Sequence, residues 1–169
     1  MQFELLYQEL AYGAEIIPAL VASITQAEAQ VRPALESWSI LEVICHLYDE
    51  EREDFRQRLD IILHRPEEKW PPNDPMGWVV TRKYNDRDLG ESLSSFVAER
   101  RQSLAWLKSL SAPNWEAEYQ TSYGPIKAGD MFASWVAHDN LHIRQLVELK
   151  RNRVMNLAEP YDVGYAGDW

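Results

Sequence analysis

Two histidines four residues apart, His138 and His142, form the most chemically suggestive pattern in the sequence. On a helix, side chains at this spacing lie on one face about one turn apart, and both imidazoles can bind one metal ion. Such pairs also occur as ordinary core or surface histidines with no ligand role. A metal site therefore requires a third ligand from elsewhere in the chain.

The helical wheel of this segment places His142 and Asp139 within the apolar face, with His138 at its edge. Ionisable groups on a buried face must be paired, hydrogen-bonded or bound to metal. Asp139 is therefore a candidate either to orient a ligand histidine and take a proton, or to serve as a structural partner.

His46 is the candidate third ligand, although its position is awkward. It lies off the centre of the apolar face of its own segment, among acidic residues, and periodicity alone favours a solvated histidine there. The alternative requires this face to line a cleft shared with the histidine pair, where a carboxylate such as Glu50 could support the site. The acidic neighbours are Glu42, Asp49, Glu50 and Glu53.

The remaining histidine and the single cysteine are weaker candidates. His64 ends its segment beside Arg65 and Pro66, which is typical of a cap or surface residue. Cys45 adjoins His46 but points about 100° away on a helix, toward the apolar face, where a small core residue is expected.

Competing catalytic motifs match poorly. The pair resembles the zinc-protease pattern H-E-x-x-H, but Asp139 replaces the glutamate and is one methylene shorter, so a general base would be misplaced. The di-iron bundle signature needs Glu-x-x-His on two helices, and only Asp139-x-x-His142 approximates it.

Four long segments carry helical periodicity, and the residues that break helices fall between them. This pattern predicts an all-α protein, a four-helix bundle with long crossover connections that forms a single domain over residues 1–169. The predicted helices span residues 2–28, 39–63, a third segment from 86 or 88 to 110, and 130–152.

Local signals refine these helices. Pro18 predicts a kink or break in the first. Ser39 and Glu42 form a capping box for the second, Pro113 closes the third, and Asp130 is the expected N-cap of the fourth.

The connections carry their own expectations. Residues 64–87 are rich in proline and aromatic residues, so this segment should pack on the bundle and could cover one mouth. Residues 114–129 indicate a short extended crossover rather than a true sheet. The aromatic tail, 160–169, should dock onto the body. Alternatively, these aromatic residues could serve a homodimer.

Composition excludes several classes of protein. The net charge of −10 argues against nucleic acid and anionic membranes as partners, because both need clustered Lys and Arg. One cysteine allows no internal disulfide. No signal-peptide pattern and no apolar run of about 20 residues are found. A cytoplasmic protein is expected.

Two segments together resemble the DinB/YfiT-like superfamily of metalloenzymes. They are Trp38–Leu47, which opens the second helix, and His138–Leu146 on the fourth. The resemblance implies a four-helix bundle in which His46, His138 and His142 hold one divalent metal, and thus a cleft-facing His46. The superfamily includes hydrolases and transferases or isomerases that use low-molecular-weight thiols.

Three neutral imidazoles leave a zinc-like ion an open position for water or substrate, so the site could activate water or a thiol. The expected protein is a metal-dependent hydrolase or thiol-dependent transferase acting on a small molecule. Zinc or nickel suits the ligands, and iron or manganese is compatible. Asp139 and Glu50 are the candidate supporting carboxylates. The alternative is a non-catalytic metal- or ligand-binding bundle in a stress response.

Overall fold

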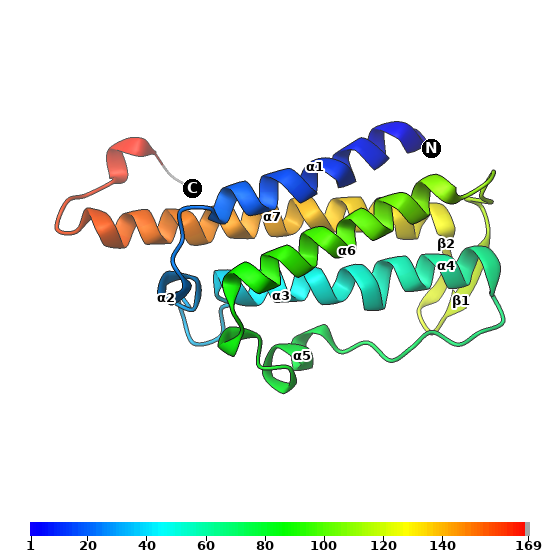
Figure 1. The fold of residues 1–169 in the computed structure, drawn as a ribbon, viewed down its shortest axis with the longest axis horizontal. Coiled ribbons are helices and arrows are strands. Elements are labelled where there is room, and N and C mark those ends of the chain that lie inside the picture. Colours follow the sequence, from blue (N-terminus) through cyan, green and yellow to red (C-terminus); the bar gives the residue numbers. More distant parts are fainter. Residues whose placement is uncertain (168–169) are drawn as a thin grey trace.

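Four long helical segments run side by side and enclose the core of this computed structural model, which describes residues 1–167 (Figure 1). The all-α prediction is confirmed. The four segments are α1 (Phe3–Val21); α3 (Ile40–Glu50), continued without a break by a π-helical turn (Glu51–Phe55) and α4 (Arg56–His64); α6 (Leu89–Ser109); and α7 (Ala128–Ala158).

The first helix is shorter than predicted. Pro18 lies inside α1 without ending it, and the chain breaks only after Val21. A new short helix, α2 (Gln26–Ala29), then begins at Thr25, whose side chain accepts from the Glu28 backbone N–H in a capping box. Thr25 and Glu28 satisfy backbone groups that would otherwise lack partners at a helix start, which is why they favour a fresh helix here.

The second helix begins as predicted. Ser39 is its N-cap, and Glu42 completes the capping box and is buried beside Arg32. The π-helical turn at residues 51–55 was not anticipated. Turns of this kind often accompany functional sites, and this one follows directly on the segment that carries His46 and Glu50.

The connection after α4 packs on the body, as expected. It contains α5 (Pro75–Thr81) and a 3₁₀ turn (Tyr84–Asp86), and it runs along the outer side of α3 (Figure 1). The buried Tyr84 hydroxyl donates to Asp49 Oδ2 at 2.6 Å and fastens this connection to α3.

The segment before α7 corrects two expectations. Strands β1 (Glu118–Thr121) and β2 (Gly124–Lys127) pair as an antiparallel hairpin, with Glu118 opposite Lys127, so a two-stranded sheet replaces the expected crossover. Asp130 is not the N-cap of α7; Lys127 is, and its backbone N–H donates to the Asp130 carboxylate at 3.2 Å. The prediction misplaced this cap because the helix begins directly from β2.

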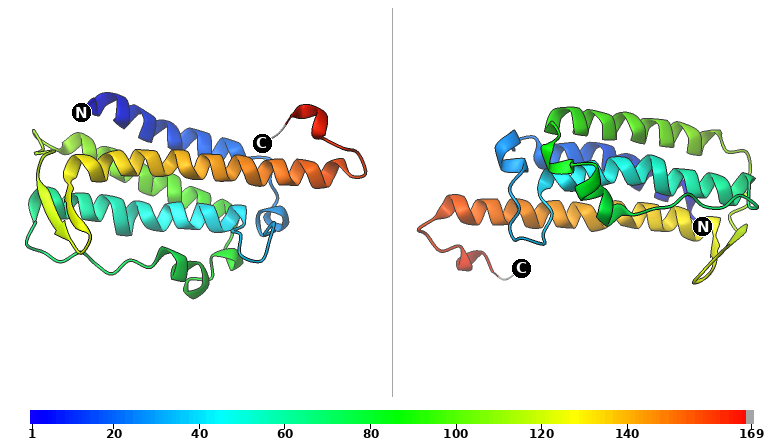
Figure 2. Two further views of the ribbon diagram at one scale, coloured as in Figure 1. Left: turned by 180° about the vertical axis from the view of Figure 1, so that it is seen from behind. Right: turned by 90° about the horizontal axis from the view of Figure 1, so that it is seen from below.

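The expected docking of the tail is wrong where the structure describes it. Tyr161 and Tyr165 are 81% and 106% exposed, and Trp169 lies outside the described residues. The reason is the length of α7, which continues to Ala158 and projects beyond the other helices (Figures 1 and 2). In the part of the chain that the structure describes, the tail therefore leaves α7 beyond the ends of the other helices (Figure 1).

An ionic network crosses the centre of the bundle. Arg100 on α6 is 1% exposed; its Nε donates to Glu51 at 2.7 Å and its Nη2 to Asp139 on α7 at 2.8 Å. Burial by itself would lower the pKa of Arg100, but the charges of Glu51 and Asp139 raise it. Gly13 on α1 is required nearby, because a Cβ there would lie 2.2 Å from Asp139 Oδ2. Arg100 Nη1 also donates to the Leu10 carbonyl oxygen on α1 at 2.8 Å, so the network joins all four helical segments.

Among the described residues, no helix combines the length and the apolar character needed to cross a bilayer.

Candidate metal centre

Three histidines from two distant parts of the chain meet inside the bundle. His46 on α3 and the pair His138 and His142 on α7 each offer a ring nitrogen, and these atoms all lie within 4.8 Å of one another. The Nε2 atom of His138 is 3.3 Å from that of His46 and 3.1 Å from that of His142. The spacing of four residues on α7 places both of its imidazoles on the face that meets α3.

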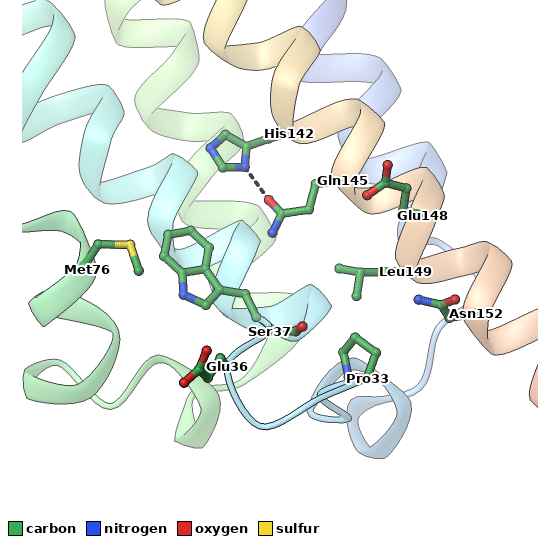
Figure 3. A pocket seen from close by; sticks show the side chains of 10 residues that line it. Pro33, Glu36, Ser37, Met76, His142, Gln145, Glu148, Leu149 and Asn152 are labelled. Atoms are coloured by element: carbon green, nitrogen blue, oxygen red, sulfur yellow. Dashed lines mark hydrogen bonds between the residues drawn. The ribbon is translucent and has the colours of Figure 1, made fainter. Parts of the chain in front are cut away.

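The orientation of His142 is set by a neighbour on its own helix. Its Nδ1 lies 2.7 Å from Gln145 Oε1, one turn further along α7 (Figure 3). A carboxamide oxygen accepts hydrogen bonds, so Nδ1 donates and Nε2 keeps a free lone pair directed at the other histidines. Such hydrogen bonds commonly orient metal-binding histidines.

All three imidazoles are held in the neutral form. Burial, followed by the neighbouring histidines, lowers the pKa of His46 to about 3 and that of His138 to about 2, and burial also lowers the pKa of His142. His46 and His142 are only 4% and 6% exposed. Neutral imidazole is the form that binds metal, so no proton must be removed from these rings at neutral pH.

The arrangement fits a cation better than it fits a set of hydrogen bonds. A neutral imidazole nitrogen either donates one hydrogen or accepts through one lone pair. Nε2 of His138 therefore cannot act both as donor to one neighbouring histidine and as acceptor from the other. The second ring nitrogen of His46, Nδ1, is buried and has no hydrogen-bond partner within residues 1–167. One cation at the meeting point of three lone pairs would satisfy every Nε2 atom at once.

Aromatic rings enclose the cluster. The Trp38 ring lies 4.8 Å from the His46 ring and parallel to that of His142 at 6.3 Å, and Phe55 lies 4.9 Å from His138. Apolar walls of this kind exclude water and strengthen electrostatic interactions within a site.

An open pocket of about 420 Å³ leads to His142 (Figure 3). Its walls come from the loop before α3, from α5 and from one face of α7. The ten lining residues are Pro33, Glu36, Ser37, Trp38, Met76, His142, Gln145, Glu148, Leu149 and Asn152. A small molecule can therefore reach the side of the cluster that His142 forms.

Periodicity alone predicted a solvated His46, and this prediction is wrong, because His46 is buried. Glu42, Asp49 and Glu50, which share its helix, are buried too. The connection that contains α5 and Tyr84 covers this side of α3, and no helical wheel of one segment can include such a covering element.

The two candidate supporting carboxylates lie in different surroundings. Asp139 accepts from Arg100 through both oxygens, so its hydrogen bonds serve the central network. Glu50 follows His46 by one helical turn and is 5% exposed, and its Oε1 has no partner among the described residues. Burial, and then the charge of Asp54, raises the pKa of Glu50 to about 8.

The other two candidates lie outside the cluster. His64 is half-exposed near Asp60, and Cys45 is buried beside Ser92. Sequence reasoning missed Gln145 and Arg100. Gln145 lies three residues after His142, within reach on the same face, and Arg100 interrupts the apolar face of the third helix between Phe96 and Leu107. These signals could have identified both residues.

The raised pKa of Glu50 predicts a pH-dependent cost to stability. Its folded pKa of about 8 exceeds the ordinary value of 4.5, so the folded protein binds more protons than the unfolded chain between these values. Stability contributed by this group therefore falls as pH rises through that window. Glu50→Gln should leave metal-free protein about as stable as wild type at pH 5 but more stable by about 2–5 kcal/mol at pH 8.

Urea unfolding at both pH values measures this difference, with the exposed Glu67→Gln as the matched control. An equal effect of Glu50→Gln at the two pH values would contradict the assigned protonation of Glu50.

The protein is a four-helix bundle with a candidate metal centre, formed by three histidines between the second and fourth long helical segments. Comparisons with known proteins agree with this fold. The sequence profile of the DinB superfamily matches residues 10–146, and the chain belongs to this superfamily. A comparison with curated proteins returned no match.

A solved structure with a similar fold is YfiT from Bacillus subtilis, described as a probable metal-dependent hydrolase with an unusual four-helix bundle topology. The TM-score is 0.79 at 19% sequence identity, over 90% of this chain and 87% of that one. At this identity, the likeness establishes the shared fold.

Proposed function

We propose that His46, His138 and His142 hold one divalent cation, and that the protein is a metal-dependent hydrolase of small molecules. The observation that carries this proposal is the convergence of three neutral imidazoles, those of His46 and His142 buried and that of His138 partly buried, with ligand atoms within 4.8 Å of one another. The description of YfiT as a probable metal-dependent hydrolase supports the same choice.

The cation would act as a Lewis acid and lower the pKa of water to about 7. The chain's own residues supply the rest. Gln145 fixes the tautomer of His142, Trp38 and Phe55 exclude water from the imidazoles, and the pocket beside His142 positions the substrate. Water exclusion and positioning account for a large share of catalysis in preorganised sites.

The pocket favours hydrolysis over thiol transfer. None of its ten lining residues is Lys or Arg, whereas Glu36 and Glu148 are among them. A carboxylate-bearing thiol would find no lysine or arginine among these residues to pair with its carboxylate. An uncharged ester or amide needs no such partner.

We propose Glu50 as the residue that carries a proton during the reaction. Its position one turn after His46 and its pKa of about 8 suit a group that changes protonation near neutral pH. Asp139 would instead hold α7, the helix that carries His138 and His142, in place through its hydrogen bonds with Arg100. Glu50→Gln should lower kcat/KM by about 100-fold or more while the metal content stays unchanged. A fall of less than about threefold would remove Glu50 from the reaction.

Removal of the metal should abolish hydrolysis reversibly. Chelated protein, reloaded separately with zinc, nickel, manganese or iron, is expected to bind one ion per chain and to regain turnover of a panel of acetyl esters and amides. Three imidazoles favour zinc or nickel among these. Mass spectrometry under native conditions gives the stoichiometry, and hydrolysis rates give the activity.

Two outcomes would contradict the proposal. Hydrolysis that survives chelation would exclude the metal from the reaction, and stoichiometric metal with no turnover of any ester, amide or thiol–electrophile pair would favour the non-catalytic binding bundle.

A further inference from the structure

A row of buried polar groups begins one helical turn after His46. Glu50, Asp54 and Arg58 follow one another at steps of four residues along α3, the π-helical turn and α4. Glu50 and Asp54 are 5% and 7% exposed. Residues four apart on an α-helix are offset by about 40° around its axis. The i→i+5 bonding of the π-helical turn winds more slowly, which reduces this offset and keeps Asp54 on the same side as Glu50.

The connection after α4 closes over this row. Asn73 Oδ1 is buried there and has no hydrogen-bond partner within residues 1–167, and Arg58 lies over the Trp70 ring at 4.6 Å. The Trp70 ring in turn stacks on that of Tyr119, with the ring centres 4.6 Å apart. Protein therefore encloses the carboxyl groups of the row, so a charge on either of them requires a compensating partner.

One of the two carboxyl groups has a cationic partner, whereas no such partner is found for the other. Arg58 Nε lies 2.7 Å from Asp54 Oδ1 in an ion pair, so the charge of an ionised Asp54 is compensated. Oε1 of Glu50 and Nδ1 of His46 both lack hydrogen-bond partners in the described part of the chain, so these two groups do not bond each other. Two carboxyl groups and one guanidinium carry no net charge only when one proton is bound, and the position of Arg58 places that proton on Glu50.

The pKa values agree with this placement of the proton. Burial, followed by the charge of Asp54 and a hydrogen bond with it, raises the pKa of Glu50 to about 8. Burial also raises the pKa of Asp54, but the charge of Arg58 and the hydrogen bond with Glu50 oppose this rise. Asn73 hydrogen-bonds the same pair and opposes the rise of both pKa values.

Charged groups on the neighbouring elements have ionic partners of their own. Their pairs are Arg100 with Glu51 and Asp139, Glu99 with Arg56, and Arg82 with Asp49 and Glu53. The imidazoles of the metal centre are neutral. The protonation of Glu50 is therefore controlled chiefly by Asp54, Arg58 and Asn73.

We infer that Asp54 is the positioning residue for Glu50: the two carboxyl groups share one proton, and the ion pair of Asp54 with Arg58 keeps that proton on Glu50. This inference rests on the proposed role of Glu50 in hydrolysis and adds the residue that controls it. In that role, Glu50 passes its proton to the leaving group and regains one from the attacking water, so the pair begins and ends each turnover with one proton. Asp54 stays ionised throughout and acts only through Glu50.

Infrared titration of the metal-free protein tests the shared proton without any need for catalysis. A protonated carboxyl group has a carbonyl stretching band that an ionised one lacks. Wild type should show such a band that disappears with a midpoint near pH 8, and Glu50→Gln should lack it. Asp54→Asn should lower the midpoint by about one pH unit or more, because it removes the neighbouring negative charge. Arg58→Met should instead raise the midpoint, because it removes a cation that favours the ionised form.

Asp60→Asn is the matched control. Asp60 on α4 also pairs with an arginine, Arg65, but this pair is partly exposed, so the substitution should leave the midpoint unchanged. Near-ultraviolet circular dichroism at pH 6 checks that each variant is folded. The opposite shifts expected for Asp54→Asn and Arg58→Met separate the inference from a general loosening of the structure, which would move both midpoints in one direction.

The outcomes separate this inference from the proposed function. A band that survives Glu50→Gln and is lost in Asp54→Asn places the proton on Asp54 and overturns the inference, as does a wild-type midpoint in Asp54→Asn. In hydrolysis, the limb of the kcat/KM pH profile that Glu50 produces should move to lower pH in Asp54→Asn, and a limb that stays in place overturns the positioning role. Infrared shifts as expected, together with wild-type hydrolysis by Glu50→Gln, support the shared proton and overturn the proposed role of Glu50 in the reaction.

Discussion

Replacement of His138 by alanine is expected to weaken metal binding by more than 100-fold and to abolish hydrolysis. His138 lies at the centre of the cluster, because its Nε2 lies within 3.3 Å of both other Nε2 atoms. Loss of a residue that only orients a metal ligand typically costs about 10–100-fold in affinity, so loss of a ligand itself should cost more. Competition with a chromophoric chelator measures the affinity.

His64→Ala is the matched control for this substitution, since His64 is exposed and lies outside the cluster. It should bind metal and hydrolyse esters as the wild type does. The metal-free His138→Ala protein should keep its helical circular dichroism, because the bundle is held by its apolar core and by the network at Arg100. Unchanged metal affinity in His138→Ala would place the ion elsewhere and remove the basis of the proposed reaction.

Replacement of Arg100 by methionine is expected to lower the free energy of unfolding by about 3–5 kcal/mol. The substitution fills a similar volume but leaves the carboxylates of Glu51 and Asp139 buried without their cation. Breaking a buried ion pair on one side costs this much because an unpaired charge remains in the interior. Urea unfolding of the metal-free proteins at pH 7 measures the difference.

Two further variants make this result interpretable. Arg101→Met changes the exposed neighbour on α6 and should have little effect. Adding Glu51→Gln and Asp139→Asn to Arg100→Met removes the uncompensated charges and should restore part of the lost stability. If Arg100→Met costs less than about 1 kcal/mol, the network contributes little to the stability of the bundle.

The features that could be predicted from sequence are those that neighbours along the chain determine. The pair His138 and His142 shares a face because helix geometry places residues four apart together. Ser39 and Glu42 cap the second helix through bonds three residues apart, and both are confirmed. The four apolar periodicities likewise predicted the bundle, because each amphipathic helix must bury its face against another.

The predictions were wrong where the structure of a segment depends on contacts with residues distant in the sequence. The sequence predicts an extended crossover where the structure forms the hairpin at residues 118–127, because pairing between strands depends on a register that single-strand composition does not reveal. The exposed tail was expected to dock because of its aromatic content. Whether a surface exists to receive it depends on how far α7 projects beyond the other helices.

The four long helices, the shared face of His138 and His142, and the resemblance that links His46 to them can all be recognised in the chain before it folds. The burial of His46, the pairing of Arg100 with Asp139 and the pocket beside His142 appear only in the folded molecule. Burial, ion pairing and cavities depend on which helices pack together. These properties are set by residues that are distant in the sequence. Such residues do not change the hydrophobic periodicity around the side chains that they bury or pair with.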